Sequence, residues 1–141
     1  MQDLNILVVD DERDIRDGLK DLLERDEYKV DTAIDGNDAL EKAKGLKYQL
    51  VISDIIMPRM SGIDLLEQIK SLSPFIEIIM ITGHSTFERT LECIEKGAIG
   101  YIEKPFENLS DITNQVKRAA EIIKGKKKVM DAAIEKIRER L

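Results

Sequence analysis

Asn5-Ile6-Leu7-Val8-Val9-Asp10-Asp11 is a short apolar run that ends in two carboxylates. Three more runs of this kind follow, and each ends in a hydroxyl or a carboxylate or leads into a lysine. They are Gln49-Leu50-Val51-Ile52-Ser53-Asp54, Ile78-Ile79-Met80-Ile81-Thr82 and Gly100-Tyr101-Ile102-Glu103-Lys104-Pro105. Runs this short, and rich in Val and Ile, are typical of strands buried on both faces. The pattern therefore predicts a parallel sheet.

Segments of helical periodicity alternate with these runs, so the chain divides into five strand–helix units. A weaker strand is expected at 29–33 on an edge of the sheet, and the last helix is expected to start near Leu109 and to be extended. Right-handed crossovers leave few topologies, and the order 2-1-3-4-5 places the first and third strands side by side. We expect an α/β, flavodoxin-like doubly wound sheet of five parallel strands with five helices.

The polar side chains at the ends of the predicted strands would meet at one edge of the sheet. Three of them are the carboxylates of Asp10, Asp11 and Asp54, which repel one another unless a cation lies among them. Mg²⁺ binds a few carboxylates and keeps several water ligands, so these residues predict a Mg²⁺ site. Asp10 and Asp11 alone fit a helix cap equally well. Asp54 ends a run so apolar that its carboxylate requires a charged partner.

The composition narrows the class of protein. A chain of 141 residues with a formal net charge of −6 fits one domain with one core. The acidic balance argues against direct nucleic-acid binding by this chain, because phosphate contacts need clustered Lys and Arg. The single Cys93 cannot form an internal disulfide and fits a buried position. Neither a run of about 18 apolar residues nor an export leader is found, so we expect no membrane contact and a cytoplasmic location.

Residues 124–141 differ from the rest of the chain, because they hold seven basic and three acidic side chains. We therefore predict a main domain over 1–123 and a C-terminal helical extension or linker over 124–141. Apolar positions recur at helical spacing in the last predicted helix, both before and after residue 124, and would suit a seam with the same helix of a second copy. These positions are Ile112, Val116, Ala119 and Ile123, then Met130, Ile134, Ile137 and Leu141. The alternative is a tail that packs on its own domain or frays. Gly125 lowers helix propensity by about 1 kcal/mol relative to Ala, which predicts a stutter, bend or break between the two sets.

Four motifs, in this order and at these spacings, resemble the receiver domain of two-component response regulators over about residues 4–123. The motifs are Val8-Val9-Asp10-Asp11-Glu12, Ser53-Asp54-Ile55-Ile56-Met57-Pro58 through Ser61-Gly62, Ile81-Thr82-Gly83 and Tyr101-Ile102-Glu103-Lys104-Pro105-Phe106. Each motif is weak by itself, but the ordered set is highly specific.

The resemblance implies a role for each matching residue. Asp54 would accept a phosphoryl group from a sensor histidine kinase or a phosphotransfer protein. Asp10, Asp11 and Asp54 would hold Mg²⁺ together with the backbone carbonyl of Ile56. Lys104 would pair with the phosphoryl oxygens, and the Lys104-Pro105 peptide would be cis.

The resemblance also implies a switch. Thr82 would reorient toward the phosphoryl group while Tyr101 turns inward, which changes the surface of the fourth helix, the fifth strand and the last helix. Positions such as Ile56 and His84 influence phosphoryl lifetime in this family, yet for His84 we prefer an exposed loop position without a catalytic role. The only chemistry expected of the chain is its own phosphorylation and dephosphorylation, so we do not expect a true enzyme. The long last helix is similar to receivers that precede an ATPase module in transcriptional activators, which favours transcription regulation as the output.

Two other functions remain as alternatives. A Mg²⁺-dependent phosphatase or phosphotransferase would also use a strand-end Asp nucleophile, but it requires a second Asp two residues later, where Ile56 stands. A flavin-binding electron carrier would have a Ser-, Thr- and Gly-rich loop after the first strand, and the loop here is Asp10-Asp11-Glu12, which repels phosphate. The residues therefore favour the receiver.

Overall fold

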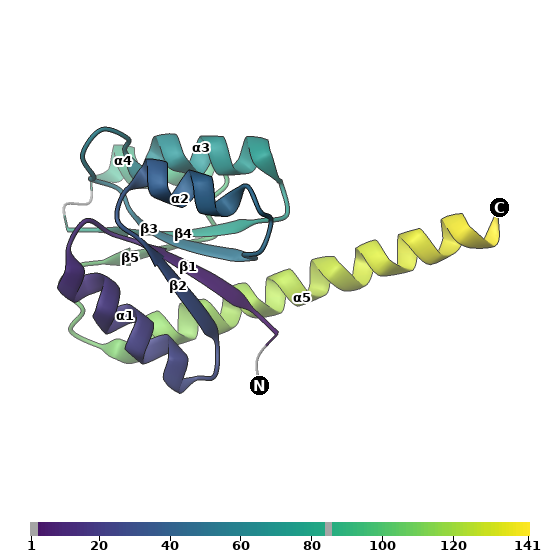
Figure 1. Ribbon diagram of the computed structural model, residues 1–141, viewed down its shortest axis with the longest axis horizontal. Helices are drawn as coiled ribbons and strands as arrows, with labels where there is room; N and C mark the ends of the chain where they lie inside the picture. Colours follow the sequence, from purple (N-terminus) through teal and green to yellow (C-terminus); the bar gives the residue numbers. More distant parts are fainter. Residues whose placement is uncertain (1–2, 84–85) are drawn as a thin grey trace.

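The computed structural model describes residues 3–83 and 86–141, so the expectation for His84 lies outside the described residues. Five parallel strands form one sheet in the order β2-β1-β3-β4-β5, which confirms the predicted fold and topology (Figure 1). The weak second strand lies on one edge, as predicted, and β5 lies on the other. The strands are β1 (Asn5–Val9), β2 (Lys29–Ala33), β3 (Leu50–Asp54), β4 (Glu77–Thr82) and β5 (Gly100–Glu103).

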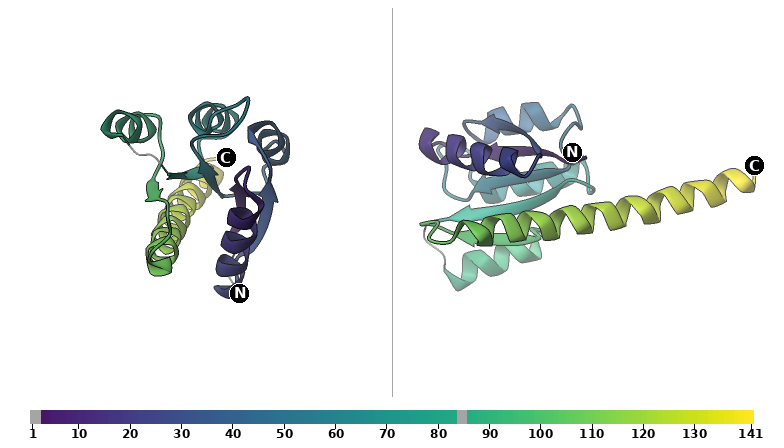
Figure 2. Two further views of the ribbon diagram at one scale, coloured as in Figure 1. Left: turned by 90° about the vertical axis from the view of Figure 1, so that its left-hand side faces the viewer. Right: turned by 90° about the horizontal axis from the view of Figure 1, so that it is seen from below.

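Helices cover both faces of the sheet (Figure 2). Side chains of α2, α3 and α4 pack in one buried cluster, and side chains of α1 and α5 pack in the other. The helices are α1 (Arg13–Arg25), α2 (Gly36–Ala43), α3 (Gly62–Leu72), α4 (Phe87–Glu95) and α5 (Leu109–Glu139). Cys93 of α4 is a buried free thiol in the first cluster, as the sequence predicts.

Because helices cover both faces of the sheet, the strands are continuous apolar runs. Along β1, Leu7 and Val9 belong to the cluster under α2, α3 and α4, whereas Ile6 and Val8 belong to the cluster under α1 and α5. Successive side chains of a strand point to opposite faces, so a strand covered on both faces must be apolar at every position. The polar side chains are thereby confined to the strand ends.

Gly62, the first residue of α3, allows the helix to begin directly against the end of β3. A Cβ at this position would lie only 2.1 Å from the backbone oxygen of Asp54. The Gly62 N–H donates to the carbonyl of Ile55 across 2.7 Å, and the Ser61 side chain caps the helix by accepting from the N–H of Asp64. This close approach fixes the loop that carries Asp54 and its neighbours.

The last helix, α5, begins at an Asn108 cap and runs without interruption for 31 residues (Figure 1). Of the stutter, bend or break predicted at Gly125, the break is therefore wrong. A single glycine costs only about 1 kcal/mol in a helix, and the hydrogen bonds of the flanking turns continue through it. From Asp131 to Leu141 every residue is exposed, and this end of α5 projects beyond the sheet (Figure 1). No helix within the described residues is both long enough and apolar enough to cross a membrane.

Candidate functional site

The carboxylates of Asp10, Asp11 and Asp54 form a cluster at the carboxyl ends of β1 and β3. These strands are direct neighbours, with Val9 paired to Ser53, so the residues that follow them meet. One oxygen of each carboxylate lies within 4.8 Å of the others, and Asp10 and Asp54 are buried while Asp11 is exposed. The predicted convergence of the three carboxylates is present.

Backbone N–H groups hold two of the carboxylates in place. Asp10 Oδ1 accepts from the N–H of Glu12 across 2.8 Å, and Asp54 Oδ1 accepts from the N–H of Ile56 across 3.2 Å. The residue at the N-cap position of α1 is Glu12, and no side-chain hydrogen bond caps this helix. Helix capping therefore does not account for Asp10 and Asp11.

The second oxygen of each buried carboxylate faces Lys104. The Lys104 Nζ donates to Asp10 Oδ2 and to Asp54 Oδ2, each across 3.1 Å. Glu12 lies further away, at 3.9 Å from the same Nζ. The Lys104-Pro105 peptide is cis, as the resemblance implied. Lys104 is thus the charged partner that the burial of Asp54 requires.

Burial and charge act against each other at this site. Burial raises the pKa of Asp54, and although the hydrogen bond and charge of Lys104 oppose this, the pKa stays above the ordinary value of an aspartate. Burial alone would lower the pKa of Lys104, but the carboxylates of Asp10 and Asp54 outweigh it and raise that pKa. One lysine therefore only partly compensates three carboxylates, and a further cation would be favoured among them.

The donor set fits a hard divalent ion. Each of Asp10, Asp11 and Asp54 can offer one oxygen at a mutual spacing that a single ion could bridge, and carboxylate oxygens are ligands that Mg²⁺ prefers. The residues present therefore fit Mg²⁺.

Thr82 and Tyr101 lie on the two strands beyond β3. Thr82 is fully buried at the end of β4, and its carbonyl accepts the N–H of Lys104 across 2.7 Å. Tyr101, on β5, pairs with Met80, and its half-buried ring packs on the cluster under α2, α3 and α4. Within the described part of the chain, its buried Oη has no hydrogen-bond partner. Thr82 is thus bonded to the backbone of Lys104, and Tyr101 lies three residues before Lys104 in the chain.

Two polar residues near the site were not singled out in the sequence. Arg16 Nη1 donates to the backbone oxygen of Asp10 across 2.8 Å, from one turn into α1. The side-chain amide of Gln115 bonds to the backbone of Tyr101. The available signal for Gln115 was its place beside the apolar stripe of α5, between Ile112 and Val116, but that position alone does not identify a partner.

Comparison with known proteins decides the family. Residues 6–117 match the response regulator receiver domain family. The chain belongs to this family. Receiver domains of response regulators are signalling switches rather than enzymes in the usual sense.

Individual relatives agree with this assignment. The transcriptional regulatory protein ZraR of Escherichia coli (strain K12) is 38% identical over 108 residues, which cover 75% of this chain and 24% of ZraR. The crystal structure of NtrX from Brucella abortus in complex with ADP matches with a TM-score of 0.86 at 36% identity, over 94% of this chain and 30% of NtrX. The solution structure of the beryllofluoride-activated NtrC4 receiver domain dimer matches with a TM-score of 0.80 at 35% identity, over 84% of this chain and 98% of that one. The chain therefore spans about a quarter of the length of ZraR and less than a third of NtrX.

Proposed function

We propose that this chain is a phosphorylation-controlled switch that accepts a phosphoryl group on Asp54 from a sensor histidine kinase or a phosphotransfer protein. The observation that carries the proposal is the position of the Asp54 carboxylate at the end of a buried strand. It lies 3.1 Å from Lys104 Nζ and shares a cluster with the carboxylates of Asp10 and Asp11. A buried carboxylate with a cation on one side and acidic ligands on the other matches the needs of phosphoryl transfer.

The residues would divide the work as follows. An oxygen of Asp54 would attack the phosphorus of the donor in line with the leaving group, so that a P–O bond forms as the P–N bond to the donor's imidazole breaks. Lys104 would turn from the carboxylates toward the transferred phosphoryl oxygens. Asp10 and Asp11, together with Asp54 and the Ile56 carbonyl, would hold Mg²⁺. When bound, Mg²⁺ neutralises negative charge on the carboxylates and on the phosphoryl oxygens.

The response would arise at Thr82 and Tyr101. A phosphoryl group adds about two negative charges and three acceptor oxygens, and the Thr82 hydroxyl could then donate a charge-assisted hydrogen bond that is absent beforehand. This bond favours one of two arrangements of the surface formed by α4, β5 and α5, with Tyr101 turned inward.

Of the alternatives, the Asp-nucleophile phosphatase is disfavoured by the environment of Asp54. The position two residues after the nucleophile is Ile56, whose side chain is exposed and cannot donate a proton. Hydrolysis would therefore lack the general acid that such enzymes use.

For the whole protein we propose a transcription regulator in which 1–123 is the receiver and 124–141 is a helical extension or linker. ZraR, a regulator named for transcription, supports this output, and the NtrC4 receiver dimer supports association between receivers. The exposed apolar side chains of the extension would be the site of association with a second copy. Several of them are exposed by two-fifths or more, namely Val129, Ile134, Ile137 and Leu141.

Phosphorylation by a small-molecule donor tests the proposed function. The chain is incubated with acetyl phosphate and Mg²⁺, and its intact mass is measured beside Asp54→Asn and, as a matched control, the exposed helical Asp17→Asn. We expect one phosphoryl adduct on the wild type and on Asp17→Asn, and none on Asp54→Asn. An undiminished adduct on Asp54→Asn would show that the acceptor lies elsewhere.

A further inference from the structure

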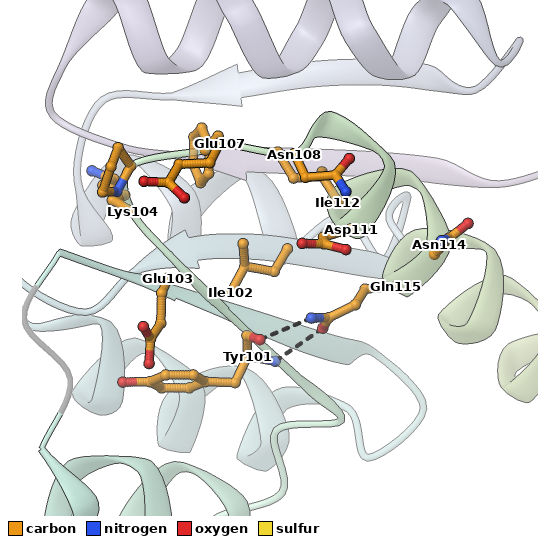
Figure 3. A pocket seen from close by; sticks show the side chains of 12 residues that line it. Tyr101, Ile102, Glu103, Lys104, Glu107, Asn108, Asp111, Ile112, Asn114 and Gln115 are labelled. Atoms are coloured by element: carbon orange, nitrogen blue, oxygen red, sulfur yellow. Dashed lines mark hydrogen bonds between the residues drawn. The ribbon is translucent and has the colours of Figure 1, made fainter.

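The strand β5 closes one side of the sheet, so its outer backbone groups have no strand to pair with. At Tyr101 the side chain of Gln115 takes the place of the missing strand. Gln115 Oε1 accepts the N–H of Tyr101 across 3.1 Å, and Gln115 Nε2 donates to the Tyr101 carbonyl across 2.9 Å (Figure 3). One amide of α5 thus makes both hydrogen bonds that a neighbouring strand would make. We call this pair of bonds the Gln115 clamp.

The clamp is held tightly on both sides. A Cβ at Gly100 would lie 2.6 Å from Gln115 Oε1 and 3.0 Å from a methylene carbon of Ile79, so only glycine leaves room for the amide. On the helix side, the buried residues Ile112 and Val116 anchor α5 against the sheet on either side of Gln115. A movement of α5 would therefore be transmitted to the backbone of β5, and the reverse.

The clamp is also close in sequence to Lys104 of the carboxylate site. Tyr101 is three residues before Lys104, whose N–H bonds to the carbonyl of Thr82 across 2.7 Å. Because the Tyr101 Oη has no partner within the described residues, the hydrogen bonds that hold Tyr101 are those of its backbone. Beside the clamp, a hollow of about 570 Å³ is lined by β5, the loop after it and the first turns of α5, and it leaves room for a shift (Figure 3).

We propose that Gln115 is a positioning residue that couples α5 to β5 and so carries the state of Asp54 to the last helix. Only the second part of this inference, that the clamp carries the state of Asp54 to α5, rests on the proposed phosphorylation of Asp54. The first part, that the clamp holds the backbone of Tyr101 to α5, can be tested in the unphosphorylated protein.

The first measurement is amide hydrogen exchange in the unphosphorylated protein. Gln115→Leu removes both bonds, whereas Asn114→Leu changes the neighbouring exposed side chain, which points away from Tyr101 (Figure 3). We expect the Tyr101 amide to exchange about tenfold faster in Gln115→Leu, the effect of losing roughly one net hydrogen bond, and at the wild-type rate in Asn114→Leu. An unchanged rate in Gln115→Leu would overturn the inference.

The second measurement adds a phosphodonor and Mg²⁺ and follows the amide chemical shifts of α5. Gln115→Leu should gain the same phosphoryl adduct as the wild type but lose most of the shift change in α5, while Asn114→Leu keeps it. A full change in Gln115→Leu would refute coupling through the clamp. If Gln115→Leu does not fold, Gln115→Ala replaces it in both measurements, because it also lacks both polar atoms of the clamp and should have the same effects. If the wild type takes no phosphoryl group, the proposed function fails, and the exchange measurement alone decides the clamp.

Discussion

Lys126, one residue after Gly125, donates a hydrogen bond across 2.5 Å to the carboxylate of Glu77, which is almost fully buried at the start of β4. The other oxygen of Glu77 lies 3.5 Å from Lys70 of α3. A buried carboxylate is costly without charged partners, so the two lysines stabilise it jointly. The pair also fixes α5 to the body of the fold next to its glycine, where the sequence predicted a disruption.

Removal of this contact should destabilise the fold. Lys126→Met leaves Glu77 with Lys70 alone, and because half of Lys126 is exposed we expect the free energy of unfolding to fall by only about 1–2 kcal/mol. Urea denaturation measures this effect, with the exposed neighbour Lys127→Met as the matched control. Equal stabilities of the two variants would mean that the Glu77 contact contributes nothing.

The hydrogen bond from Tyr48 to Asp31 predicts that the stability of the fold falls at alkaline pH. Tyr48 Oη donates to Asp31 Oδ2 across 2.5 Å, and burial together with the Asp31 carboxylate raises the pKa of Tyr48 from 10.0 to about 12. The folded state therefore holds this proton more tightly than the unfolded state does. The resulting stability is fully present below pH 10 and is lost as the pH rises toward about 12.

Tyr48→Phe removes this titration. Because Asp31 is partly exposed, we expect the variant to lose only about 1 kcal/mol of stability at neutral pH. Urea denaturation across the alkaline range should show a smaller further decline in Tyr48→Phe than in the wild type. Parallel curves for the two proteins would contradict the assigned role of the tyrosine proton.

Much of the fold could be predicted from the sequence because the strands are covered on both faces. Continuous apolar runs such as 78–81 identify the strands, and their polar ends place Asp10, Asp54 and Lys104 at one edge without any knowledge of packing. The Lys104 contacts with Asp10 and Asp54 follow from this topology, since the loop after β5 opens on the same edge.

Contacts across elements were not predictable in the same way. Propensity and the mismatch of the two apolar sets predicted a stutter, bend or break at Gly125, but α5 continues without a break, with the tertiary contact between Lys126 and Glu77 beside the glycine. Gln115 was missed because its partners are backbone groups of Tyr101, and backbone groups leave no pattern in the sequence. The periodicity of apolar residues indicates which residues are buried, but it does not indicate which partners polar side chains such as Gln115 and Lys126 bind.

Metal binding should depend on the exposed member of the carboxylate cluster. Lys104 pairs with Asp10, Asp54 and Glu12, and Asp11 is the exposed member of the cluster, so Asp11→Asn should fold normally. We expect saturating Mg²⁺ to raise the Tm of the wild type and to raise that of Asp11→Asn by roughly half as much or less, because one ligand charge is lost. Thermal unfolding with and without Mg²⁺ provides the measurement, and Glu12→Gln is the control. A full Mg²⁺ effect in Asp11→Asn would place the ion elsewhere.

The exposed seam of the extension predicts association between copies. A charge at Ile137 should disrupt a helix seam, whereas a charge at Ala132, on the opposite side of the same helix by spacing, should not. Solution mass is measured across micromolar concentrations for the wild type, Ile137→Glu and Ala132→Glu, each with and without phosphorylation. We expect dimers for the wild type and Ala132→Glu and monomers for Ile137→Glu. A wild type that stays monomeric in both states would rule out the seam.

A phosphoryl-like group on Asp54 should change the surface formed by α4, β5 and α5. Amide spectra recorded with Mg²⁺ before and after addition of beryllofluoride, which can occupy the place of the phosphoryl group on a carboxylate, test this most directly. For the wild type we expect shift changes at Asp54 and Thr82 and across α4, β5 and the start of α5, and for Asp54→Ala we expect none. Shift changes of the same size in Asp54→Ala, or changes in the wild type confined to the loops around the carboxylates, would show that Asp54 does not control this surface.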